Sequence, residues 1–115
     1  MTLPNTENLT LVRGDDYSQA FEFTQTVSSF TQIYFTARVA YATYETDNSA
    51  AAFSAMLGSG ISAIGSNTVQ LDITHAQSLT LTAASYYYDI QVLTTTGKIY
   101  TTQRGMLRVL SDVTR

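Results

Sequence analysis

The sequence predicts an all-β domain, an antiparallel sandwich of seven or eight short strands with at most one short helix. Apolar and polar residues alternate over several short runs, which is the period of a half-buried strand. The 115 residues include 19 Thr, 11 Ser and 8 Tyr, and only 13% are charged. Hydroxyl-bearing, β-branched and aromatic residues fit a pleated surface, whereas a helical bundle needs Ala, Leu, Glu and Lys throughout. Turn residues separate the runs at the spacing of a sandwich.

A chain of this length forms one domain with a core of its own. We expect an N-terminal arm at residues 1–8 and a single β-sandwich domain at residues 9–115. The first two expected strands are Leu9 to Arg13 and Tyr17 to Thr24, separated by a Gly-Asp-Asp turn. The longest alternation begins at Gln32, and its inward row is Ile33, Phe35, Ala37, Val39 and Tyr41.

The middle of the chain has weaker patterns. Residues 45–49 form a turn or loop, Ala50 to Leu57 fits either a short helix or a strand, and Ile61 to Ile64 fits a short strand. A tight hairpin turn is expected at Gly65-Ser-Asn67. The next strand has an inward row of Val69, Leu71 and Ile73.

A capping box, Thr74-x-x-Gln77, predicts a helical turn that ends at about Leu79. Two strands follow, joined by a turn at residues 95–98, and Gly105 is expected to break or bulge the second of them. In the first of these strands, alternation sends Tyr86 and Tyr88 to the core and Tyr87 to the other face. Leu107 and Val109 continue the inner row.

Composition excludes several classes of function. Six basic and nine acidic residues give a net charge of −3, so the chain lacks the basic footprint of a nucleic-acid-binding protein. The chain has no Cys and one His, which excludes thiolate zinc sites, cysteine nucleophiles and His clusters. We expect no membrane partner, since no run of about eighteen apolar residues occurs. The first residues lack the pattern of a signal peptide, so we expect assembly in a cytoplasm.

Several short motifs occur in a fixed order. They are Leu11-Val-Arg-Gly-Asp15, Tyr86-Tyr-Tyr-Asp-Ile-Gln91, Gly97, the segment Thr101 to Gly105, and a closing Val109-x-x-Asp112-Val-Thr-Arg115. In these motifs the chain resembles the small β-sandwich proteins of tailed bacteriophages and is similar to the N-terminal domain of the upper baseplate protein. The resemblance implies an immunoglobulin-like sandwich that serves as a structural module of a virion.

The expected function is therefore non-enzymatic. The protein is expected to be an adaptor or connector at the tail or baseplate that links neighbouring virion proteins or anchors a fibre. Its partners would be other phage virion proteins and further copies of itself, and its location the virion, assembled in the host cytoplasm. A capsid decoration (cement) protein is the alternative, followed by a carbohydrate-binding module. No cofactor is expected.

Candidate interface residues come from three features of the sequence. Outward aromatic residues form an aromatic patch of the kind enriched at protein interfaces. The last strand offers a sheet edge that a neighbour can extend. The Arg-Gly-Asp turn faces either a partner or water, and its arginine pairs with Asp89 or Asp112. The candidates are Arg13, Asp15, Tyr34, Tyr44, Tyr87, Met106, Arg108 and Arg115.

Two further groups of residues carry side chains that could take part in metal binding or catalysis. Asp15 and Asp16 with Asp72 or Asp89 would supply oxygen ligands for Ca²⁺, but they lack EF-hand spacing, so no metal is expected. His75 falls inside the capping box, which indicates a surface helix residue. No Gly-x-Ser-x-Gly elbow accompanies it, so no catalytic residue is expected.

Overall fold

The computed structural model describes residues 5–39 and 52–112. In these residues strands dominate, with one five-residue α-helix and one 3-10 turn. The predicted all-β fold with one short helix is confirmed. The elements in chain order are β1 (Asn5–Thr6), β2 (Leu9–Val12), β3 (Tyr17–Glu22), η1 (Val27–Ser29), β4 (Phe30–Val39), β5 (Phe53–Leu57), β6 (Gly60–Ala63), β7 (Thr68–Ile73), α1 (His75–Leu79), β8 (Ala84–Thr94) and β9 (Ile99–Leu110).

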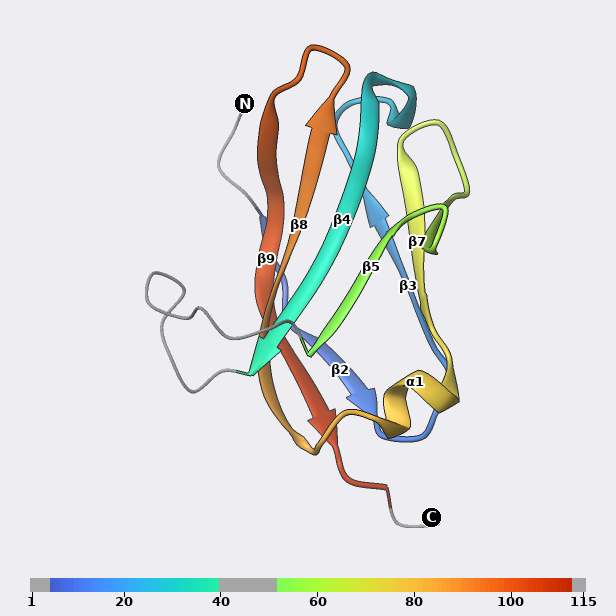
Figure 1. The fold of residues 1–115 in the computed structure, drawn as a ribbon, viewed down its shortest axis with the longest axis vertical. Helices are drawn as coiled ribbons and strands as arrows, with labels where there is room; N and C mark the ends of the chain where they lie inside the picture. The colour runs from blue at the N-terminus through green and yellow to red at the C-terminus, as the bar shows by residue number, and fades with distance from the viewer. Residues whose placement is uncertain (1–4, 40–51, 113–115) are drawn as a thin grey trace.

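The nine strands of this described part form one continuous sheet in the order β1-β9-β8-β4-β5-β6-β7-β3, with β2 also paired to β9. The sheet curls, so that β7 and β3 lie across the core from β8 and β9 (Figure 1). A short pairing between β5 and β6 joins the two layers. Most pairs are antiparallel, as predicted, whereas β1–β9, β2–β9 and β5–β6 are parallel.

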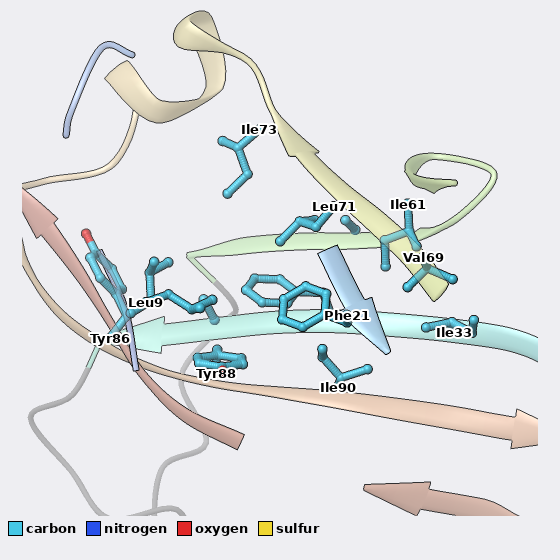
Figure 2. Close-up of a cluster of buried hydrophobic side chains, with 14 of the residues drawn as sticks. Leu9, Phe21, Ile33, Ile61, Val69, Leu71, Ile73, Tyr86, Tyr88 and Ile90 are labelled. Atoms are coloured by element: carbon cyan, nitrogen blue, oxygen red, sulfur yellow. The ribbon is translucent and has the colours of Figure 1, made fainter. Parts of the chain in front are cut away.

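The core lies between these two layers and consists of the alternating rows that the sequence predicts. Val69, Leu71 and Ile73 of β7 are each at most 1% exposed. They point toward the layer that carries Tyr88 and Ile90 of β8 (Figure 2). Burial of this apolar surface is the main force that holds the layers together, at roughly 25 cal/mol per Å² removed from water.

Strand β4 supplies the centre of the opposite layer. Ile33, Phe35 and Ala37 are buried, and the Phe35 ring stacks on Tyr88 with the ring centroids 5.2 Å apart. Tyr86 and Tyr88 are both 1% exposed, which confirms their predicted place in the core. Tyr41, at the end of this predicted row, lies outside the described residues, as does the side chain of Val39.

One segment that the sequence left open and two predicted turns have definite structures. The segment that fitted helix or strand forms strand β5 over its described residues. The predicted hairpin turn joins β6 to β7, with the Ile64 N–H donating to the Thr68 carbonyl at 3.0 Å. The turn between β8 and β9 is also confirmed, and Gly97 supplies its left-handed backbone at φ +87°.

Gly105 does not break or bulge β9, contrary to the sequence prediction. It stays in register opposite Tyr88, and the irregularity lies at Thr102, where the pairing with β8 shifts. The glycine is required for another reason. A Cβ at this position would overlap the backbone carbonyl of Glu7, so only a glycine lets the N-terminal segment pass this close to β9.

A small polar network fixes the N-terminal segment to the sheet. The Tyr88 hydroxyl donates to the Glu7 carbonyl at 2.6 Å, and the buried Gln103 amide donates to the Tyr88 hydroxyl at 3.0 Å. Gln103 also donates to the Glu7 carboxylate at 3.2 Å. Burial raises the pKa of Tyr17, and the Glu7 carboxylate raises it further. Residues 5–8 of the expected arm are thus tied to β9, and Asn5–Thr6 form strand β1.

The capping box and the helical turn are confirmed. The Gln77 N–H donates to the Thr74 hydroxyl, and the Thr74 N–H donates to the Gln77 side chain. The fully buried Ser78 connects the helix to the turn between β2 and β3. Its hydroxyl accepts from the Gly14 N–H and donates to the Asp15 carbonyl. Among the described residues, no helical segment has the length and apolar character needed to cross a bilayer.

Candidate functional site

Four of the candidate interface residues lie on one surface, the outer face of β4, β8 and β9. Tyr34, Tyr87, Met106 and Arg108 each neighbour buried residues along their strands, so alternation directs them away from the core. We call this surface the arginine face, and its outward side chains include Tyr34, Thr36, Arg38, Ser85, Tyr87, Asp89, Gln91, Arg104, Met106 and Arg108.

The strand register determines which of these side chains are neighbours. Tyr87 lies directly opposite Arg38 on one side and Met106 on the other. Tyr34 lies opposite Gln91 of β8 and Met56 of β5. Directly opposed residues have Cβ atoms about 4.5–5.5 Å apart, so each row forms a continuous line of contact across the sheet. The face therefore combines tyrosine and methionine with arginine.

Asp89 is the only acidic side chain among the described residues of this face. It lies opposite Arg104 and diagonal to Arg38. Burial raises the pKa of Asp89, and the two arginines partly oppose that shift. Because burial dominates, the carboxylate is poorly hydrated even though two cations are close to it. The centre of the face is thus a partly desolvated charge cluster.

An apolar margin extends the face beyond β9. Val12 of β2 lies opposite Leu110 of β9, and these side chains are 37% and 36% exposed. Tyr34 and Met56 have similar exposure, 37% and 38%. Apolar side chains at both margins of a charged centre leave surface that a partner could remove from water.

Arg13, another candidate, is bound to groups of its own chain. Its guanidinium donates to the Leu79 carbonyl at 2.9 Å and the Leu81 carbonyl at 3.0 Å, and pairs with Asp112 at 3.2 Å. Of the two carboxylates that the sequence offered, Asp112 is therefore the partner and Asp89 is not. Arg13 joins β2, the end of α1 and the end of β9, which is a structural role.

The Asp-rich turn lies beside the start of α1. Asp16 accepts from the His75 N–H at 2.6 Å and contacts the His75 ring nitrogen Nδ1 at 3.0 Å, and both side chains are exposed. Asp15 and Asp16 line a shallow depression with Gly14 and His75. In residues 5–39 and 52–112, no three acidic, His or Cys side chains come together as metal ligands.

The remaining candidates, Tyr44 and Arg115, lie outside the described residues. The sequence patterns do not single out Arg38, Arg104 or Met56 as members of the face. The alternation of β4 and β9 would have identified the two arginines as outward-facing. Their proximity to Asp89 depends on strand register, which the alternation does not give.

No family model and no curated protein sequence matches this chain. Solved structures resemble its fold. One is a chain from a study of T cell specificity and activation by the bacterial superantigen toxic shock syndrome toxin-1. The likeness has 12% identity, a TM-score of 0.56, and coverage of 90% of this chain and 92% of that one. Another is CopC from Methylosinus trichosporium OB3b, with 11% identity, a TM-score of 0.52, and coverage of 99% and 90%. At this identity the likeness concerns the fold alone.

Proposed function

We propose that this protein is a non-enzymatic structural module of a tailed-phage virion, an adaptor that binds neighbouring virion proteins through its arginine face. The observation that carries the proposal is the composition of that face. Tyrosine, methionine and arginine, which are enriched in protein interfaces, share this face at Tyr34, Tyr87, Met106 and Arg108. The order of short motifs that resembles phage β-sandwich proteins supports the virion setting.

The construction of the face suits a permanent contact. Its side chains stand on three long strands whose opposite faces are packed in the core, so little backbone motion accompanies binding. Long aromatic side chains on a rigid support lose little conformational entropy when a partner covers them. Asp89, already partly desolvated between arginines, loses less hydration on burial than a fully solvated carboxylate would.

The test is to locate the protein in purified virions by mass spectrometry of separated heads and tails. The adaptor function predicts recovery with the tail fraction. Recovery with heads would replace it with the decoration alternative, and absence from both fractions would refute the virion assignment.

A pair of matched variants links that result to the arginine face. Tyr34→Ser removes an exposed aromatic ring from the face and should reduce the number of copies per particle. Lys98→Ser removes a long exposed side chain from the β8–β9 turn, away from both outer sheet faces, and should not. Equal incorporation of both variants would show that the face does not mediate assembly.

Glycan binding is the second candidate for the same surface. Tyr34 of β4 lies opposite Gln91 of β8, and Tyr87 lies two residues from Asp89 on β8. Aromatic rings flanked by amide and carboxylate groups suit a sugar. A glycan array with the purified chain tests this candidate. Binding that Tyr34→Ser abolishes would favour it, whereas an array without signal would leave the protein-binding function.

A further inference from the structure

Charge is divided unevenly between the two layers of the sheet. Among the residues that the structure describes, the arginine face holds three of five basic residues and one of seven acidic residues. It therefore carries a charge of +2, and the other described residues together carry −4. The three arginines are Arg38, Arg104 and Arg108. A protein with a low total charge thus has one distinctly positive face.

The opposite layer has a negative outer face, which we call the acidic face. It consists of the outward side chains of β3, β6 and β7, and no basic residue is among them. Glu22 and Asp72 supply its two charges. The other side chains are short or amide-bearing, so the surface is nearly flat, and they are Ser18, Ala20, Ser62, Thr68 and Gln70.

The charges on the two faces have the same spacing. Arg104 and Arg108 are four residues apart on β9, in a stretch of regular register. Glu22 lies opposite Thr68, which is four residues from Asp72 on β7. At about 3.3 Å per residue, both separations are about 13 Å along the strands. Two arginines of one copy can therefore align with two carboxylates of another copy.

The shapes of the faces also fit each other. The arginine face projects bulky side chains such as Tyr87 and Met106, whereas the acidic face offers Ser18 and Ala20, both exposed. Large side chains can approach a backbone that only small residues cover. The Asp72 carboxylate is already oriented, since it accepts from the Ser18 hydroxyl and from the Gln70 amide.

We propose that the arginine face of one copy binds the acidic face of the next copy, so that the chain associates head to tail. This inference rests on the proposed function and names the partner as a second copy of this chain. The two faces are different and lie on opposite sides of the core. The contact is therefore heterologous and propagates into a ring or a stack instead of closing as a two-fold dimer.

A single contact of this kind is weak. With strands about 4.8 Å apart, the outward surface of β3, β6 and β7 is about 14 Å by 20 Å, below the size of a standard interface. We expect a dissociation constant on the order of 0.1 mM or weaker, together with strong salt dependence. A surrounding particle strengthens such contacts because it holds the copies at high local concentration.

Complementary charge-reversal variants test the inference by sedimentation equilibrium at low salt and high protein concentration. Arg108→Glu reverses one charge of the arginine face, and Glu22→Lys reverses one charge of the acidic face. Each variant alone should therefore associate at least about tenfold more weakly than the wild type. In their mixture, the intact arginine face of one variant meets the intact acidic face of the other, and the two reversed charges also attract each other. The mixture should therefore recover association that continues beyond twice the monomer mass of 12.6 kDa.

The double variant Arg108→Glu/Glu22→Lys places the reversed charges opposite each other and should restore open-ended association. Lys98→Glu makes the same change of charge in the exposed β8–β9 turn and should leave association unchanged. Monomers at every concentration, or a mixture that behaves like its separate components, would overturn the inference. The proposed function fails separately, if the protein is absent from both virion fractions.

Discussion

Arg13→Ala is expected to be among the most destabilising substitutions of a partly exposed residue in this protein. The guanidinium makes three contacts, two with backbone carbonyls at the end of α1 and one with Asp112. The Asp112 side chain is only 8% exposed, and within the described residues its Oδ2 has no hydrogen-bond partner. Removal of the arginine leaves a buried carboxylate that has no other cation beside it among the described residues.

The magnitude follows from these contacts. Hydrogen bonds to a charged group each contribute about 1.5–3 kcal/mol, and loss of one partner of a buried ion pair costs about 3–5 kcal/mol. The Arg13 side chain is 35% exposed, so solvent screens part of the attraction and the contacts do not add fully. We expect a loss of about 2–4 kcal/mol in the free energy of unfolding. For a domain of this size, the melting temperature then falls by about 8–15 °C.

Urea titration and thermal melting, both followed by circular dichroism, measure this loss. Arg13→Lys keeps the charge, but its ammonium cannot reach all three acceptors in the geometry of the planar fork, so an intermediate loss is expected. Lys98→Ala, in an exposed turn, serves as the control for removal of a basic residue. An Arg13→Ala protein within about 0.5 kcal/mol of the wild type would refute the role of Arg13 as a structural tie.

Three further predictions follow from the fold. Gly105→Ala should cost about 1–3 kcal/mol through overlap with the Glu7 carbonyl, and amide exchange should rise in residues 5–8; unchanged exchange would contradict the close approach. Thr74→Ala removes the acceptor for the Gln77 N–H and should cost about 0.5–2 kcal/mol, whereas Thr74→Ser should be nearly neutral in the same urea titration. Asp89 has a raised pKa in the folded state, so it binds its proton more tightly there than in the unfolded chain. Its contribution to stability is present below pH 3.8 and is lost as the pH rises through the folded pKa. Asp89→Asn should remove that decline from the pH profile of unfolding, and a profile identical to the wild type would contradict the assignment.

The sequence predicts the core of this protein well, because alternation within each strand separates inward-facing from outward-facing residues. Alternation alone identifies Val69, Leu71 and Ile73 as inward-facing, and it separates Tyr87 from Tyr86 and Tyr88. The capping box at Thr74 is equally local, since both of its hydrogen bonds join residues three apart. These features follow from backbone geometry over a few residues.

Features that depend on long-range pairing are not predictable in this way. Alternation carries no information about strand direction, so it does not predict the parallel pairing of β1 and β2 with β9. Gly105 fits a bulge when only its own strand is considered, and its real constraint comes from Glu7, far away in the sequence. The cluster of Asp89 with Arg104 depends on the register of two strands, which the irregularity at Thr102 helps to set. The candidate site was therefore found as separate residues and not as a face.

The parallel pairing of β2 with β9 has a mechanical consequence. Four consecutive residue pairs, from Leu9↔Leu107 to Val12↔Leu110, join the two strands side by side and in the same direction. Consider a force that pulls on the N-terminal end of β2 and on the C-terminal end of β9. Because the strands are parallel, this force pulls them in opposite directions along their axes, perpendicular to the hydrogen bonds between them. In this shear geometry the bonds share the load and must break together, whereas a hairpin pulled at its open end separates one bond at a time. A module tied in this way between its neighbours would transmit tension while its core stays closed.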